Sequence, residues 1–125
     1  QAGALKKTLV GEIERPGGPG TPGMLVQEVP LDAGAVKDIA FQLKAEAAPL
    51  FAVLGSKAGG KPTLTCLITE ELAQEKDWNA GQMIRELARH IQGGGGGQPF
   101  FATAGGKNPE GMEDALAAAR AIFKG

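Results

Sequence analysis

The chain has very few of the side chains from which catalytic and metal sites are usually built. It contains one cysteine, Cys66, one histidine, His90, and no tyrosine. A single cysteine excludes an internal disulfide, and with a single histidine it excludes a zinc site made from Cys and His ligands of this chain. Cys66 lies in a β-branched stretch with no histidine or acidic residue beside it, so we expect a buried thiol without chemistry.

The sequence also lacks a large net charge and a long apolar segment. Its 13 basic and 14 acidic residues leave a formal charge of −1, so any nucleic-acid binding must come from a local basic patch. No apolar run approaches the roughly 20 residues that span a bilayer, and the N-terminal QAGALKK has neither an initiator Met nor a signal-peptide core. We therefore expect no membrane association, a reducing cytoplasmic location, and a chain cut from a longer polypeptide.

No arrangement of residues indicates catalysis. Acid–base and nucleophilic mechanisms need a base with a positioned partner, and the acidic residues are scattered. No GK[ST] follows the glycine-rich stretch, so a nucleotide-binding loop of that type is absent. We expect the chain by itself to be non-catalytic and to hold no cofactor.

Glycine is abundant instead, with 20 of the 125 residues, and five are consecutive at Gly93–Gly97. A strand-like segment follows at Phe100–Ala104, then Gly105 and Gly106, then Lys107 and a helix start at Asn108. A backbone without Cβ atoms lets another molecule come close, and a helix start beside a lysine suits an anion such as phosphate. Alternatively, Gly93 ends the preceding helix and the other glycines form a flexible linker.

We predict that the glycine run is an exposed loop outside the core. On that interpretation Gly95→Val would weaken ligand binding and leave the fold largely intact.

The first quarter of the chain predicts a helix end followed by a hairpin. Residues 1–7 read as the last turns of an upstream linker helix, and residues 8–125 as one globular domain. Thr8–Glu14 reads as a strand, joined by the Pro- and Gly-rich loop Arg15–Gly23 to a second strand at Met24–Val29.

The middle of the chain predicts a helix over Ala33–Ala47, capped by Asp32, because apolar residues recur there with a helical period. The unbroken apolar run Leu50–Leu54 is typical of a strand covered on both faces. A turn at Gly55–Lys61 joins it to a β-branched strand at Thr63–Thr69, which gives a hairpin.

The next helix begins at Ala80, because Asn79 is placed as its N-cap, and the glycine run ends it. Arg85 and Arg89 lie one turn apart on its outer face, either bridged by an anion or solvated and balanced by Glu86. His90 has the same spacing from Glu86, and we interpret it as a surface partner of that carboxylate.

A last helix starts at Pro109 and closes the chain. The predicted fold is therefore α/β, with α+β as the alternative: a single domain with a mixed sheet of about five strands and three helices packed on it.

The run GGGGGQPFFATAGGK, preceded by NAGQMIRELARHIQ, resembles the C-terminal domain of alanyl-tRNA synthetases, which belongs to the DHH-associated domain family. The resemblance extends from about Thr8 to the end. It departs from the pattern at Gln98 and Phe100, where many relatives carry Arg and Asp.

This resemblance implies a strand of the glycine-rich block beside the Asn79–Gln92 helix. It also implies an RNA-binding arm that grips the outer corner of an alanine-specific tRNA and helps present it to aminoacylation and editing domains upstream. ATP, Mg and Zn would serve the parent ligase, not this domain. Together with the residues suited to holding a sugar–phosphate backbone, it gives these candidate RNA-binding residues: Lys57, Lys61, Arg85, Arg89, Gly94, Gly95, Gly96, Gly97, Gln98, Lys107 and Asn108.

Two other interpretations stay open at this point. In DHH-family phosphoesterases a related domain binds the phosphates of the substrate above a metal-bearing catalytic domain, which would have to lie upstream. The third interpretation is a homodimerisation module that uses Phe100, Phe101 and the glycine run. Because the net charge is near zero, we expect any tRNA binding by the isolated domain to be weak.

Overall fold

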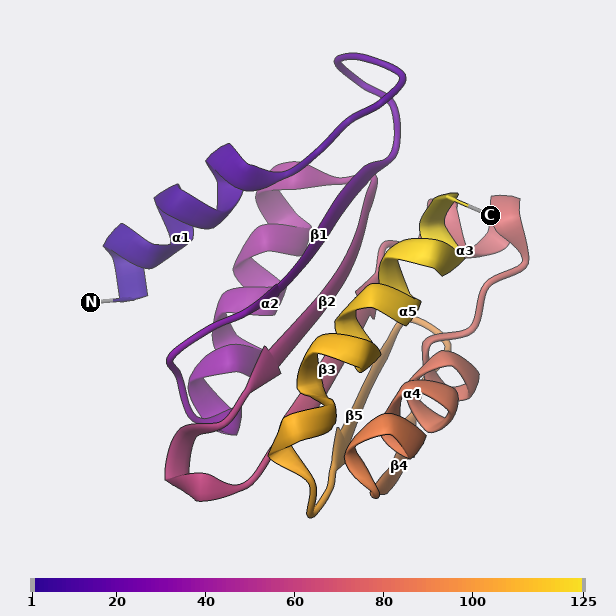
Figure 1. The fold of residues 1–125 in the computed structure, drawn as a ribbon. Coiled ribbons are helices and arrows are strands. Elements are labelled where there is room, and N and C mark those ends of the chain that lie inside the picture. Colours follow the sequence, from indigo (N-terminus) through magenta and orange to yellow (C-terminus); the bar gives the residue numbers. More distant parts are fainter. Residues whose placement is uncertain (1, 125) are drawn as a thin grey trace.

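The computed structural model describes residues 2–124, and its five strands form one mixed sheet (Figure 1). The strand order is β1-β2-β3-β5-β4. β1 and β2 are parallel, which requires the crossover helix between them, and all other neighbours are antiparallel. The strands are β1 (Gly23–Glu28), β2 (Leu50–Ser56), β3 (Thr63–Ile68), β4 (Gly94–Gly97) and β5 (Phe101–Gly105).

Helices cover both faces of this sheet. The helices are α1 (Ala2–Glu12), α2 (Ala33–Ala47), α3 (Glu70–Lys76), α4 (Ala80–Ala88) and α5 (Met112–Lys124). α1 and α2 lie on one face, and α3, α4 and α5 on the other. The predicted α/β class with a mixed five-stranded sheet is confirmed, although five helices replace the expected three.

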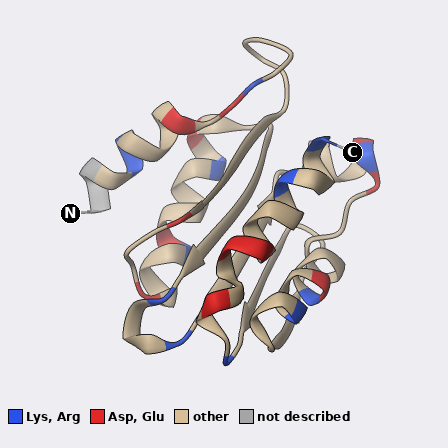
Figure 2. Cartoon of the chain, in the orientation of Figure 1, with Lys and Arg blue, Asp and Glu red and all other residues tan. Residues whose placement is uncertain are grey.

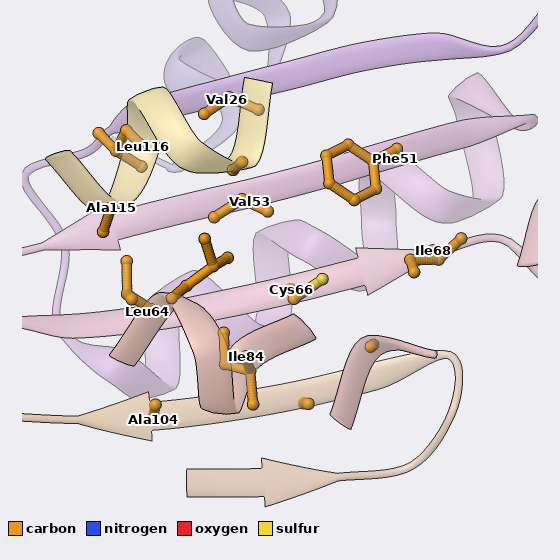
Figure 3. Packing of buried hydrophobic residues seen from close by; sticks show 14 of the residues in the cluster. Val26, Phe51, Val53, Leu64, Cys66, Ile68, Ile84, Ala104, Ala115 and Leu116 are labelled. Carbon is orange, nitrogen blue, oxygen red and sulfur yellow. The ribbon is translucent and has the colours of Figure 1, made fainter. Parts of the chain in front are cut away.

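Alternation along the strands divides the interior into two cores. Phe51 and Val53 of β2 point to the α4 and α5 side, where Figure 3 shows them packed with residues of β1, β3 and β5. Leu50, Ala52 and Leu54 point to the α1 and α2 side. Every residue of β2 is buried, so the prediction of a strand covered on both faces is confirmed.

Two of the three helix starts predicted from capping signals are confirmed, whereas the start predicted at Pro109 is a 3-10 turn, Pro109–Gly111, without a side-chain cap from Asn108, and α5 begins at Met112. The carboxylate of Asp32 accepts a hydrogen bond from the Ala35 N–H at 2.9 Å, and α2 has the predicted bounds. The side chain of Asn79 accepts one from the Gln82 N–H at 3.1 Å. α4 then tightens into a 3-10 turn at Arg89–Ile91 before the glycine run.

The predicted strand at Thr8–Glu14 is wrong, because α1 continues to Glu12. Leu5, Leu9 and Ile13 recur at helical spacing, and all three pack in the core on the α2 side, with Leu9 fully buried. A single bridge between Glu14 and Met24, with N···O distances of 2.9 and 2.8 Å, is what remains of the expected hairpin.

Helix α3 was missed by the sequence analysis. It has seven residues, too few for a clear apolar period, and buries Leu72 and Ala73. Glu70 and Glu71 in its first turn and Lys76 in its last turn complement the helix dipole. This distribution of charge was the sequence feature that indicated a helix here.

Cys66 is fully buried in the core between β2 and β5. Burial raises the pKa of its thiol from 9.0 to about 12, so the thiol stays protonated at neutral pH. The expected buried thiol is therefore confirmed. Within residues 2–124, no helix is both long and apolar enough to span a membrane.

The packing of α1 predicts unequal effects at two adjacent positions. Leu9→Ala should lower the free energy of unfolding by about 2–5 kcal/mol, because it removes a fully buried side chain. Val10→Ala, at a residue that is 38% exposed, should change it by less than about 0.5 kcal/mol. Chemical denaturation measures both, and equal effects would contradict the packing of α1 against α2.

Candidate nucleic-acid interface

The glycine run, predicted as a loop, is the edge strand of the sheet. Gly94–Gly97 pair antiparallel with Ala102–Gly105, and the Gln98 N–H closes the hairpin by donating to the Phe101 carbonyl at 2.8 Å. Glycine has a low intrinsic preference for strands. The reason for a strand made of glycines must therefore lie in its contacts with the rest of the fold.

That constraint is steric and alternates along β4. A Cβ on Gly93, Gly95 or Gly97 would lie only 2.0, 2.2 or 2.6 Å from a carbonyl oxygen of β5. A Cβ on Gly94 would meet nothing within 4 Å, and one on Gly96 only the Arg85 guanidinium at 3.7 Å. None of the five glycines has a positive φ, so close backbone approach is the reason for the first three.

Backbone hydrogen bonds hold helix α4 against this hairpin. The Ala80 N–H donates to the Pro99 carbonyl at 2.8 Å, and the Gly93 N–H donates to the Ala88 carbonyl at 2.9 Å. A Cβ on Gly81 would lie 3.0 Å from the Gly97 oxygen. The strand that the glycine-rich block was expected to form, now β5, thus lies beside the 79–92 helix, as the resemblance implied.

The chain returns from β5 to α5 at the same end of the sheet. The N–H groups of Lys107 and Asn108 both donate to the Ile91 carbonyl at 2.9 Å, so these amides are used inside the fold. Glu113 and Asp114 occupy the first turn of α5. An anion at this end would therefore be held by the lysine side chain and not by the helix start.

A cleft of about 480 Å³ opens between the β3, β4 and β5 ends. It unites three of the predicted residues, Lys61, Gly94 and Lys107, and no acidic side chain lines it. Its lining residues are Lys61, Pro62, Thr63, Gln92, Gly93, Gly94, Gly105, Gly106 and Lys107.

The remaining predicted basic residues lie outside this cleft. Arg85 flanks β4, beside Gly96. Arg89 forms an exposed ion pair with Glu86 at 3.5 Å, one of the two arrangements foreseen for it. Lys57 lies 3.6 Å from Glu28.

A second cleft of about 440 Å³ adjoins the first, because both are lined by Thr63 and Gly105. Lys37 of α2 and Thr103 of β5 also line it, and the sequence analysis assigned neither a role. The available sequence signal was the alternation of Ala102 and Ala104 with the polar Thr103, and in the structure both alanines are buried while Thr103 is exposed.

Acidic residues line a different cleft. Glu28, Glu113, Asp114 and Arg120 are among its lining residues, and Figure 2 shows acidic residues on α5 as well as on the other helices. Arg120 donates to the Val26 carbonyl at 2.9 Å. Within residues 2–124, no group of three or more His, Cys, Asp or Glu side chains is arranged to hold a metal ion.

The DHHA1 domain family model matches residues 21–125 of the chain. The chain is 50% identical over 120 residues to an alanine–tRNA ligase of Christiangramia forsetii, covering 96% of this chain and 13% of the relative. It is 51% identical over 88 residues to the alanine–tRNA ligase of Bacteroides thetaiotaomicron, covering 70% of this chain and 10% of the relative. The chain thus spans a small part of the length of these relatives.

Two solved structures share the fold. The C-Ala domain from Aquifex aeolicus alanyl-tRNA synthetase matches with a TM-score of 0.73 and 25% identity, over 91% of this chain and 99% of that one. A DHH domain protein of the s1p family of ribosomal proteins matches with a TM-score of 0.58 and 10% identity, over 94% of this chain and 29% of that one. The second likeness concerns the fold alone.

The alternation along β4 predicts opposite results at neighbouring glycines. Gly95→Ala should destabilise the fold by about 1–3 kcal/mol or more, because its Cβ would overlap the Thr103 oxygen and Ala104. Gly94→Ala, which meets open space, should change stability by less than about 0.5 kcal/mol.

The earlier expectation that Gly95→Val would leave the fold intact is therefore wrong. Chemical denaturation of the two alanine variants provides the measurement. If Gly95→Ala is as stable as Gly94→Ala, β4 does not approach β5 as closely as described.

Proposed function

The chain belongs to the DHHA1 domain family, and from this membership we propose that it is the tRNA-binding C-terminal domain of an alanine–tRNA ligase. The observation that carries the proposal is the cleft at the end of the sheet. Two lysines there, Lys61 and Lys107, face a backbone of glycines without an intervening carboxylate. Such a surface matches a sugar–phosphate backbone, because charge is attracted and no side chain keeps the RNA away from the β4 and β5 amides.

The distribution of charge orients the RNA. Arg85 continues the basic surface from the cleft along the β4 edge, whereas α5 presents Glu113 and Asp114 on a different face. Phosphates are therefore favoured at the cleft and the β4 edge and repelled from α5. With so few cations engaged, we expect weak binding that depends strongly on salt.

In this role the domain holds the outer corner of the tRNA and keeps one tRNA within reach of both aminoacylation and editing. The chain spans only 13% of the length of the Christiangramia relative, so we assign both reactions to other domains of a longer cytoplasmic protein. ATP, Mg²⁺ and Zn²⁺ would act in those domains.

The alternatives have less support. The relative that carries a DHH domain shares only the fold, whereas the relatives with high sequence identity are alanine–tRNA ligases. Dimerisation through Phe100 and Phe101 is disfavoured because both rings are partly buried against the two cores.

The cleft predicts which lysines matter for tRNA. Lys61→Ala and Lys107→Ala should each weaken binding about 3- to 10-fold and reduce the slope of log K against log salt by about 0.7–0.9. Lys57→Ala is the matched control, because Lys57 lies beside Glu28 and outside the cleft, and it should change neither quantity.

The measurement is fluorescence anisotropy with labelled tRNA at several salt concentrations. Equal losses in all three variants would show nonspecific attraction, and undetectable binding at low salt would refute the proposal. Ala-tRNA formation by the purified chain would refute the assignment of catalysis to other domains.

A further inference from the structure

One face of the sheet is only partly covered. On this face α2 packs over β2 and β3 and reaches β5 through the ring of Phe41, while Thr103 and Gly105 of β5 remain exposed. The other helices that contact β5, such as α4, lie on the opposite face (Figure 1). We call the part of this face between α2 and β4 the open face.

The floor of the open face carries few side chains. Strand alternation places Phe101, Thr103 and Gly105 on it, and the residues of β4 that pair there, Gly94 and Gly96, have no side chains. The second cleft lies over this floor and continues into the lysine cleft at Thr63 and Gly105. From Gly105 to Phe101 the strand extends for about 13 Å, so a ligand that spans this length reaches from the lysines to the aromatic rings.

An aromatic pair with one exposed ring lies at the Phe101 end of this floor. The rings of Phe41 and Phe101 are stacked, with centroids 4.9 Å apart and planes 25° apart, and Phe41 is 42% exposed. Phe41 lies outside the buried stripe of α2. A stacked pair with an exposed ring accepts a further planar ring, and a nucleobase has the required π-face.

Positive charge accompanies the aromatic pair. Lys37 precedes Phe41 by one helical turn, which places both on the same side of α2, and it lines the second cleft. Lys61 and Lys107 line the adjoining cleft, and neither cleft has an acidic lining residue. Of the acidic residues nearby, Asp32 is engaged as the N-cap of α2, whereas Asp38 is exposed three residues before Phe41 and Lys44 follows Phe41 at the same spacing.

We propose that the open face binds unpaired nucleotides of the RNA, with one base stacked on Phe41 and the phosphates following Lys37 toward Lys61. The inference rests on the proposed function and adds what that function leaves open, namely that loop nucleotides and not only duplex backbone are recognised. A protein partner fits less well, because the exposed large hydrophobic side chains within residues 5–124 are Phe41 and the distant Val10 of α1. Such isolated rings do not form the contiguous apolar patch of a protein interface.

The test compares two probes, a mixed-sequence single-stranded oligoribonucleotide and a blunt RNA duplex, by fluorescence anisotropy. Phe41→Ala should weaken single-strand binding roughly 5- to 100-fold, the effect of losing one base–aromatic stack, and leave duplex binding unchanged. Phe41→Trp should retain single-strand binding, with quenching of the introduced indole by the stacked base. Val10→Ala is the matched control for an exposed apolar residue away from this face, and it should alter neither probe.

Lys37→Ala provides a second test that leaves the aromatic pair intact. For the single-stranded probe, it should reduce the slope of log K against log salt by about 0.7. It should not alter the melting temperature of the protein. Unchanged single-strand binding in both Phe41→Ala and Lys37→Ala would overturn the inference, while continued sensitivity of tRNA binding to Lys61→Ala would leave the proposed function standing.

The remaining outcomes are also decisive. If no probe, including tRNA, binds the wild-type chain, the proposed function fails and the inference fails with it. If the wild-type chain self-associates in sedimentation experiments, and Phe41→Ala abolishes this without changing RNA binding, the open face is a protein interface and the inference is overturned.

Discussion

The structure depends on the close approach of β4 to β5 and α4, which leaves no room for Cβ atoms at Gly93, Gly95 and Gly97. Backbone contact at these positions holds the edge strand in register and lets the Ala80 N–H reach the Pro99 carbonyl. Gly94 and Gly96 are not subject to this steric requirement, and their lack of side chains leaves the exposed positions of β4 bare. Gly94 lines the lysine cleft.

Charge is separated on a chain that is almost neutral overall. The cleft lysines come from two different connections, Lys61 from the turn before β3 and Lys107 from the segment after β5, and the sheet brings them to one end. Glu113 and Asp114 of α5 line a different cleft, and the other acidic residues are spread over the remaining elements. A cleft with two lysines and no acidic lining residue attracts a polyanion without holding it tightly, which agrees with the weak tRNA binding that we propose.

The parts of the fold that were predicted correctly depend on local signals. The caps Asp32 and Asn79 and the apolar period of α2 act within one or two turns, so the sequence reveals them directly. The helical period of Leu5, Leu9 and Ile13 was present but was interpreted as a strand. The β4 strand could not be predicted, because a run of glycines has no alternation of apolar and polar residues. The open face could not be predicted either, because Phe41 and Phe101 are far apart in the sequence and come into contact only in the folded chain. Within the site, Lys61 and Lys107 were foreseen as basic residues, but their shared cleft was not.

The central claim is that RNA binds at the glycine edge and its clefts, and amide chemical-shift mapping with tRNA tests it most directly. In a titration of the ¹⁵N-labelled chain, the largest changes should fall on Gly94, Gly96, Thr103 and Gly105, since these amides lie on or beside the exposed floor. The amides of Glu113 and Asp114 on α5 should not move. Changes centred on α5, or spread evenly over the surface, would contradict the account.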